Sequence, residues 1–162
     1  MRENALKIVE YLRENKLHIA TAESCTGGLI AAAITDIPGS SEVFDCGVVS
    51  YGEDIKNSVL GVSKNVLEKN GAVSFACASM MAQGVASVAK AEIGVSATGY
   101  AGPGGGTEND PVGTVYIGVY LKNNGHTSFS KSFRYVFEGD REAVRNAAVE
   151  QAFAEICKLL YI

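Results

Sequence analysis

The segment LHIATAESCTGGLIAAAI, residues 17–34, places a β-like run, a short polar turn and a continuous apolar run in direct succession. Leu17–Thr21 is typical of a strand, and the small apolar residues from Gly27 onward predict a buried helix. Open α/β sheets place their ligands above the carboxyl ends of strands, where such a turn exposes its side chains. The segment therefore predicts an α/β fold with a candidate ligand site in the turn at residues 22–28.

Helices and strands alternate over most of the chain, and a hairpin and a last helix follow. Ser63, Ser74 and Asp140 are suitable N-caps for helices, and Asn123-Asn124-Gly125 is a hairpin turn signal. This order predicts a three-layer α/β/α sandwich with a mixed, mostly parallel sheet of about five or six strands. The expected helices cover residues 3–15, 27–34, 53–60, 63–71, 75–90 and a segment after 140, and the expected strands cover 17–21, 43–51, 93–98, 114–121 and 127–137.

Length and composition indicate one domain, assigned to residues 1–162, because no repeat, linker or low-complexity tract interrupts the chain. Fourteen basic and eighteen acidic side chains give a net charge of −4, which argues against direct binding to nucleic acid or to an anionic membrane. The apolar runs are too short to cross a bilayer, and the first residues lack the pattern of a signal peptide. We therefore expect a cytoplasmic protein whose four widely spaced cysteines are free thiols.

The turn Ala22-Glu23-Ser24-Cys25-Thr26-Gly27-Gly28 is the first candidate site. A helix N-terminus offers unpaired N–H groups, which can hold a phosphate or the oxyanion formed when a carbonyl is attacked. The alternative is structural, with Ser24 or Thr26 as a simple helix cap and the glycines as aids to packing. Cys25 is a second possible nucleophile, but His18 and His126 are isolated in the sequence, so neither an activating histidine nor a histidine metal site is indicated.

Lys56 lies in the second candidate site, where the strand that ends near Ser50-Tyr51 passes into a short helix. A lysine can act as a base only when burial or nearby positive charge keeps its amine neutral. If Lys56 reaches Ser24, the two residues form a Ser–Lys pair that activates the serine hydroxyl. The alternative, favoured by the sequence alone, is an ordinary solvated helix lysine.

The third candidate is a glycine-rich loop of about fourteen residues, Gly99 to Val112. Its glycines superficially satisfy a dinucleotide-binding fingerprint, but that fingerprint requires a following helix, whereas Asn109-Asp110-Pro111 and another strand follow here. The loop either wraps its N–H groups around a phosphate or is a flexible surface loop.

Arg141 and Arg145, four residues apart, lie on one face of the last helix and form the fourth candidate. Such a pair can clamp a phosphate or a carboxylate, although a solvated face is the commoner arrangement and is the one we expect for Arg141.

The order of these motifs resembles the CinA C-terminal domain family, whose stand-alone members include nicotinamide-nucleotide amidases of the PncC type. The resemblance extends over nearly the whole chain. The matching blocks are Thr21-Ala22-Glu23-Ser24-Cys25-Thr26-Gly27-Gly28, Ile37-Pro38-Gly39-Ser40-Ser41, Val49-Ser50-Tyr51 with Lys56, Gly71-Ala72-Val73-Ser74, Gly99-Tyr100-Ala101-Gly102-Pro103, Pro111-Val112-Gly113-Thr114-Val115 and Gly139-Asp140-Arg141-Glu142-Ala143-Val144-Arg145.

The resemblance implies an amidohydrolase that converts nicotinamide mononucleotide to nicotinate mononucleotide and ammonia in the pyridine nucleotide cycle. It implies Ser24 as the nucleophile and Lys56 as its base, with no metal or cofactor required and a homodimer as the expected assembly. The remaining roles are assigned to three groups of residues. Tyr51 and Thr98 would orient the lysine or the amide, the turn residues Cys25, Thr26, Gly27 and Gly28 would bind the oxyanion and substrate, and Gly102, Gly104, Gly105 and Arg145 would hold the phosphate.

The sequence departs from the family pattern at Gly52, Glu53, Asp54 and Gly104, all of which border the expected pocket. These departures bear on the choice of substrate rather than on the fold. Two alternatives therefore stand beside the amidase: a catalytically inactive nucleotide-binding module associated with competence and DNA damage, and an amidase for another small carboxamide.

Overall fold

The computed structural model describes all 162 residues, and its strands form one five-stranded sheet in the order β2-β1-β3-β4-β5. β1 pairs in parallel with β2 and β3, whereas β3–β4 and β4–β5 are antiparallel. Four strands consequently share one direction and β4 opposes them, as the sequence predicts for a mixed, mostly parallel sheet. The strands are β1 (Ile19–Glu23), β2 (Phe44–Val49), β3 (Ile93–Gly99), β4 (Thr114–Asn123) and β5 (His126–Val136).

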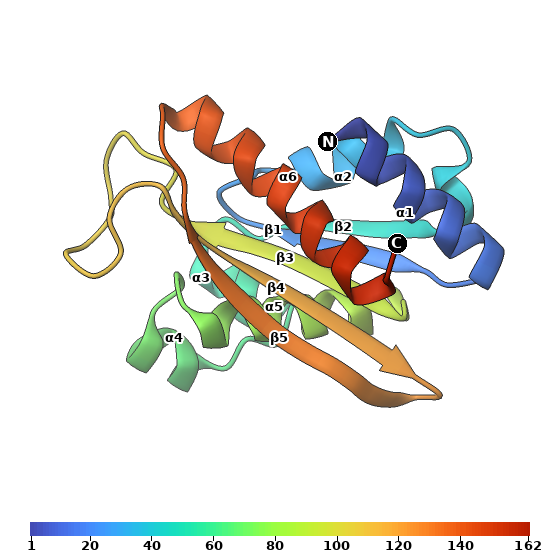
Figure 1. Cartoon of the computed structure of the whole chain (residues 1–162). Helices are drawn as coiled ribbons and strands as arrows, with labels where there is room; N and C mark the ends of the chain where they lie inside the picture. The colour runs from blue at the N-terminus through green and yellow to red at the C-terminus, as the bar shows by residue number, and fades with distance from the viewer.

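Helices cover both faces of this sheet, which confirms the predicted three-layer α/β/α sandwich (Figure 1). One layer holds α1, α2 and α6, and the other holds α5 with the two short helices α3 and α4. The helices are α1 (Arg2–Asn15), α2 (Leu29–Thr35), α3 (Glu53–Ser58), α4 (Lys64–Asn70), α5 (Phe75–Ala89) and α6 (Arg141–Leu160), with a short 3₁₀ turn η1 (Ser40–Glu42) before β2.

Local sequence signals account for where most helices begin. The side chains of Ser63, Ser74 and Asp140 each accept a hydrogen bond from a main-chain N–H in the first turn of α4, α5 and α6. The second helix begins at Leu29, two residues later than the sequence predicts, because Gly27 and Gly28 have positive φ angles of 62° and 97° and form the preceding turn.

The main core lies between the sheet and the layer of α1, α2 and α6, and it includes Ile8, Leu12 and Phe153. On the opposite face α5 approaches the sheet very closely because glycines lie beneath it. A Cβ atom on Gly118 would lie 2.3 Å from the carbonyl oxygen of Ala78 in α5. This close packing holds α5, and the segment that precedes it, against the carboxyl end of β3.

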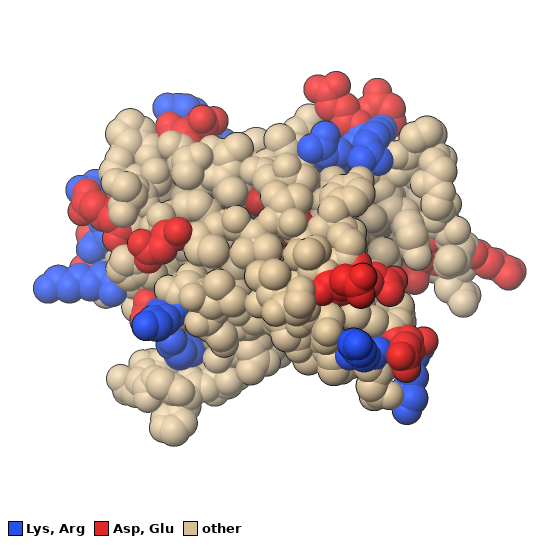
Figure 2. All heavy atoms as spheres, turned by 180° about the vertical axis from the view of Figure 1, so that it is seen from behind, with Lys and Arg blue, Asp and Glu red and all other residues tan.

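Charged side chains of both signs are interspersed over the face of the molecule shown in Figure 2, with no continuous basic patch on that face. None of the helices is both long enough and apolar enough to pass through a lipid bilayer.

Candidate active site

Ser24 lies directly after β1, at the carboxyl edge of the parallel part of the sheet. Its N–H donates a hydrogen bond to the carbonyl of Ala97 in β3, with a distance of 2.9 Å, so that the pairing of β1 with β3 continues to the serine itself. The side chain is half-buried. The turn predicted from the sequence therefore presents Ser24 at the edge where open α/β sheets bind ligands.

Lys56, on the short helix α3, is only 1% exposed, and its Nζ lies 3.2 Å from Ser24 Oγ. The two residues are thus at hydrogen-bond distance, and the alternative of a solvated helix lysine does not hold. Loss of water around the amine lowers the pKa of Lys56 below its usual value, although the neighbouring thiols and Glu53 act in the opposite direction. Burial of the amine thus favours its neutral form, the form that a lysine base requires.

Ser50 connects these two residues through its main chain. Its N–H donates a 2.8 Å hydrogen bond to the carbonyl of Glu23, and its own carbonyl accepts a hydrogen bond from Lys56 Nζ. The pairing of β2 with β1 thereby fixes the lysine amine relative to the residue that precedes the nucleophile.

Glu23 is 1% exposed and binds the first turn of α2 with its carboxylate. Its two oxygens accept hydrogen bonds from the N–H groups of Gly28, Ile30 and Ala31, at distances of 3.0, 3.0 and 2.8 Å. The end of α2 that the sequence suggests as an anion site is therefore occupied by an internal carboxylate, which offsets the partial positive charge of the helix.

Two of the N–H groups in the turn at residues 25–28 already have acceptors inside the protein and are not available to a ligand. The N–H of Gly27 donates to the carbonyl of Ser24, and that of Gly28 donates to Glu23. The N–H groups of Cys25 and Thr26 donate to no main-chain or carboxylate acceptor, and both lie near the Cys25 thiol. Burial raises the pKa of the Cys25 thiol to about 11, which keeps it protonated at neutral pH and favours Ser24 as the nucleophile.

Arg145 contacts the same turn from α6. Its Nε donates to the carbonyl of Cys25 at 3.1 Å, and its Nη2 donates to the carbonyl of Thr26 at 2.9 Å. We expected Arg145 to bind the substrate phosphate. In the structure, however, two of its five N–H donors are already bonded to the main chain of the turn at residues 24–28.

Arg141, which the sequence favours as a solvated residue, connects two further parts of the candidate site. Its Nη1 donates to the carbonyl of Gly102 at 2.7 Å, and its Nη2 donates to the hydroxyl of Tyr51 at 3.1 Å. Tyr51 is therefore bound to Arg141 rather than to Lys56. Thr98 is buried and donates its hydroxyl proton to the carbonyl of Ala72 at 2.8 Å. Thr98 is therefore also not a hydrogen-bond partner of the Lys56 amine.

The glycine-rich loop leads into β4 and not into a helix, which confirms that it is no dinucleotide fingerprint. Asp110 fixes its far end to the sheet by accepting hydrogen bonds from the Tyr116 hydroxyl and from Arg134 Nε, both at 2.9 Å. Gly104 and Gly105 lie in the exposed part of the loop, and neither has a hydrogen bond within the protein. The loop is thus held at both ends, with a free stretch between them.

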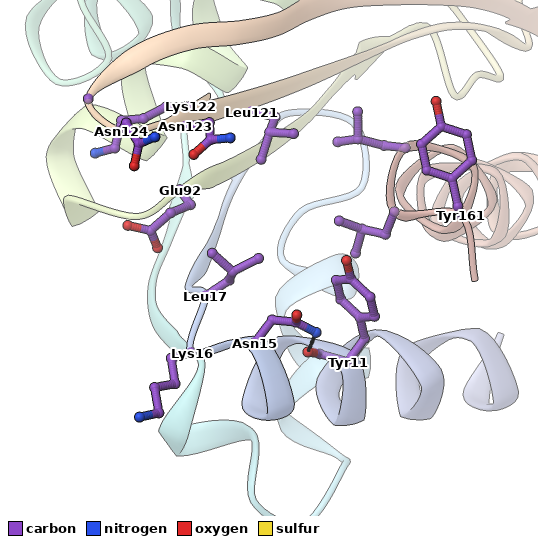
Figure 3. A pocket seen from close by; sticks show the side chains of 13 residues that line it. Tyr11, Asn15, Lys16, Leu17, Glu92, Leu121, Lys122, Asn123, Asn124 and Tyr161 are labelled. Atoms are coloured by element: carbon purple, nitrogen blue, oxygen red, sulfur yellow. Dashed lines mark hydrogen bonds between the residues drawn. The ribbon is translucent and has the colours of Figure 1, made fainter.

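A separate cavity of about 620 Å³ lies at the other end of the parallel strands, where β1 and β3 begin (Figure 3). It is lined by residues that precede β1 and β3, such as Leu17 and Glu92, together with Tyr11 and Tyr161. No serine or buried lysine lines it, so it is separate from the Ser24 site. No group of three or more His, Cys, Asp or Glu side chains is placed to hold a metal ion.

The fold and the site together define a three-layer α/β domain with a serine–lysine pair at the carboxyl edge of its sheet. A model of the CinA C-terminal domain matches residues 2–160, and the chain belongs to that family. It is 48% identical over 153 residues to a Clostridium tetani protein named as competence-damage inducible, and 41% identical over 153 residues to a CinA-like protein of Thermotoga neapolitana. Each alignment covers 94% of this chain and 36% of the relative, so the chain spans about a third of the length of these curated relatives.

Solved structures agree over nearly the whole chain. The competence damage-inducible protein A of Klebsiella pneumoniae superposes with a TM-score of 0.91 at 35% identity, covering 99% of this chain and 96% of that one. A competence/damage inducible protein of Agrobacterium tumefaciens gives 0.89 at 38% identity, covering 98% and 94%. The family predicted from the sequence motifs is therefore confirmed, and so is its α/β fold.

Proposed function

We propose that this domain is an amidohydrolase that deamidates nicotinamide mononucleotide to nicotinate mononucleotide and ammonia. The observation that carries the proposal is a lysine amine withdrawn from water and 3.2 Å from a serine hydroxyl. A buried lysine costs the fold stability, because removing a charged amine from water is unfavourable. That cost is explained when the neutral amine has a chemical task.

In the proposed reaction the neutral Lys56 amine accepts the proton of the Ser24 hydroxyl, and Ser24 Oγ forms a bond to the carboxamide carbon. The carbonyl oxygen becomes an oxyanion, which the N–H groups of Cys25 and Thr26 stabilise. Lys56 then gives its proton to the amide nitrogen, the carbon–nitrogen bond breaks, and ammonia leaves. An ester of Ser24 remains.

Water completes the cycle. Its oxygen attacks the ester carbon while Lys56 accepts one of its protons, and the second tetrahedral intermediate collapses to release the carboxylic acid, which gives its proton to the solvent or to the departed ammonia and becomes the carboxylate. The proton on Lys56 returns to Ser24 Oγ, and the amine is again neutral. Arg145 supports both steps because it holds the carbonyl of Cys25, and the peptide unit that carries this carbonyl points the Thr26 N–H to its opposite side.

Ammonia release from nicotinamide mononucleotide by the purified chain tests the proposal. We expect turnover in the unaltered protein and a loss of at least about a thousandfold in Ser24→Ala and in Lys56→Met, because the two residues act as one unit. Ser130→Ala, which removes an exposed hydroxyl on β5, is the matched control and should leave the rate unchanged.

Ammonia release no faster than that of Ser24→Ala, with the nucleotide still bound, would refute the amidase and leave a nucleotide-binding module. Faster hydrolysis of other small carboxamides than of the nucleotide would move the proposal to a different substrate of the same chemistry.

A further inference from the structure

A pocket of about 360 Å³, which we call the aromatic pocket, lies between β5 and the end of α6. α6 packs chiefly on β3 and β4, so that β5 extends beyond it at the edge of the sheet (Figure 1). Alternate residues of a strand point to the same side, and three half-buried aromatic residues of β5 therefore line the pocket together. They are Phe129, Phe133 and Tyr135, and Tyr161 adds a fourth ring at the end of α6.

Glu155, on α6, supplies the only carboxylate of the aromatic pocket. The residue is 5% exposed, and its Oε1 accepts three hydrogen bonds, at 2.7 Å from Tyr135, 2.9 Å from Gln151 and 2.7 Å from Lys158. Its Oε2 accepts none and retains contact with solvent. Because Glu155 lines the aromatic pocket, this oxygen is a free acceptor in the pocket wall.

The carboxyl group of Glu155 is ionised. Burial on its own would raise its pKa, but the three donors outweigh this effect and lower the pKa below its usual value. The hydroxyl that binds it stays neutral, because burial and the hydrogen bond to Glu155 raise the pKa of Tyr135 to about 12. The one cation paired with the carboxylate is Lys158, whose side chain is 67% exposed. A solvated lysine three residues away neutralises a buried charge only weakly.

The rings of the aromatic pocket favour a positive charge as well. Aromatic rings attract cations through their faces, and Lys131 Nζ lies 5.4 Å from the centre of the Phe133 ring. Lys131 is exposed and does not line the pocket. The carboxyl end of α6, which Leu159 and Tyr161 bring to the pocket, carries a partial negative charge. Rings, carboxylate and helix end therefore all select a cation.

We propose that the aromatic pocket binds a methylated ammonium group, as found in small quaternary amines. The methyl groups on such a nitrogen pack against the rings while its charge faces the ring surfaces and the Glu155 carboxylate. A primary ammonium has three N–H donors to satisfy, and the carboxylate of the pocket offers one free oxygen. The inference does not depend on the proposed amidase, because no residue of the Ser24 site lines this pocket.

Calorimetric titration with choline tests the inference, and its neutral analogue, in which carbon replaces the nitrogen, is the matched ligand. The unaltered protein should bind choline about tenfold more tightly than the analogue, because only choline carries a charge. Choline should also bind more tightly than ethanolamine, its primary amine counterpart. Glu155→Gln should weaken choline binding about tenfold and leave binding of the analogue unchanged. Lys158→Met should strengthen choline binding, because it removes the ammonium that competes for the carboxylate.

A second variant keeps the test decisive if Glu155→Gln fails to fold. Phe133→Leu retains the carboxylate and an apolar side chain but removes one ring, and it should weaken choline binding. Glu68→Gln, an exposed change on α4, and Ser24→Ala are the controls, and neither should alter the affinity. NMR contacts between the choline methyl protons and the Phe133 ring should place the ligand in the aromatic pocket.

Four results would overturn the inference. They are the absence of choline binding, an affinity for the neutral analogue within about twofold of that for choline, tighter binding of ethanolamine than of choline, and unchanged choline binding in both Glu155→Gln and Phe133→Leu.

Discussion

At the scale of single residues, the proposed function depends on an amine that is kept out of water. Lys56 is among the largest fully buried side chains of the protein, and its only hydrogen-bond partners are Ser24 Oγ and the Ser50 carbonyl. Neither partner carries a charge that would hold a proton on the amine. Cys25 and Cys77, although buried nearby, stay as thiols because burial raises the pKa of each to about 11.

The lowered pKa of Lys56 predicts how stability changes with pH. Below its ordinary value of 10.5 the unfolded chain binds a proton at Lys56 that the folded protein resists binding, so the free energy of unfolding falls as the pH falls. The fall ends at the folded-state pKa. Lys56→Met removes this dependence. Urea unfolding of both proteins at several pH values should show the unaltered protein losing stability relative to Lys56→Met as the pH decreases, and a difference that does not vary with pH would contradict this.

Glu23 predicts a second effect at this scale. In Glu23→Gln one carboxylate oxygen becomes an NH₂ group, which faces an N–H of α2 that then has no acceptor. We expect a loss of about 1–3 kcal/mol in the free energy of unfolding, the usual cost of an unsatisfied buried donor. Glu68→Gln, an exposed change on α4, should cost nothing measurable in the same thermal or urea unfolding experiment. Equal stabilities of the two variants would refute the role of Glu23.

The sequence indicated the turn at residues 22–28 as a candidate site from its place between a strand and a helix, and Ser24 as the nucleophile only through the family resemblance, but it did not indicate the contacts of Glu23 and Arg141. Local patterns do not encode these contacts. Glu23 lies in a strand, yet its carboxylate binds a helix five to eight residues later. Arg141 binds Tyr51, which is 90 positions away. The Ser24–Lys56 pair was expected only through the family resemblance, because a lone lysine on a short helix is usually solvated.

At the scale of elements, the packing of α5 decides effects that helix propensity would predict with the wrong sign. Gly84 lies inside α5, where alanine is intrinsically favoured by about 1 kcal/mol. However, a Cβ atom there would lie 1.9 Å from the carbonyl oxygen of Leu60, which is main chain and cannot move aside cheaply. Gly84 is therefore required by the contact between α5 and the segment that follows α3.

We accordingly predict that Gly84→Ala lowers the free energy of unfolding by about 1–3 kcal/mol, the usual cost of overpacking. Gly104→Ala is the control, because nothing lies within 4 Å of the added atom and the residue has no positive φ. Thermal unfolding compares the two variants. A gain in stability for Gly84→Ala would show that propensity outweighs packing at this position.

Element boundaries were largely predictable where a cap marks them, as at Ser63, Ser74 and Asp140. The apolar face of α1, which includes Ile8 and Leu12, was predictable for the same local reason, a helical repeat of buried residues. The start of α2 was not, since two glycines in the left-handed region form a turn instead of a first helical turn.

At the scale of the whole molecule, both edges of the sheet are open, with β2 at one edge and β5 at the other. Large apolar side chains are exposed beside the first of these, at Val49, Ile55 and Val59. Unpaired edges and exposed apolar residues favour association. We therefore propose a homodimer, for which light scattering should give twice the chain mass of 17.0 kDa, and a mass of one chain at micromolar concentration would contradict the proposal.

The protonation state of Lys56 is the most direct test of the proposed mechanism, because both nucleophilic attacks require its neutral amine to accept a proton. NMR of the lysine side chains, with the Lys56 signal assigned by its loss in Lys56→Met, follows this amine as the pH is raised. We predict that Lys56 loses its proton below 10.5 and before the exposed lysines, and that kcat/KM rises with the same midpoint. A Lys56 that stays protonated up to 10.5 or beyond, in a protein that still releases ammonia, would contradict it.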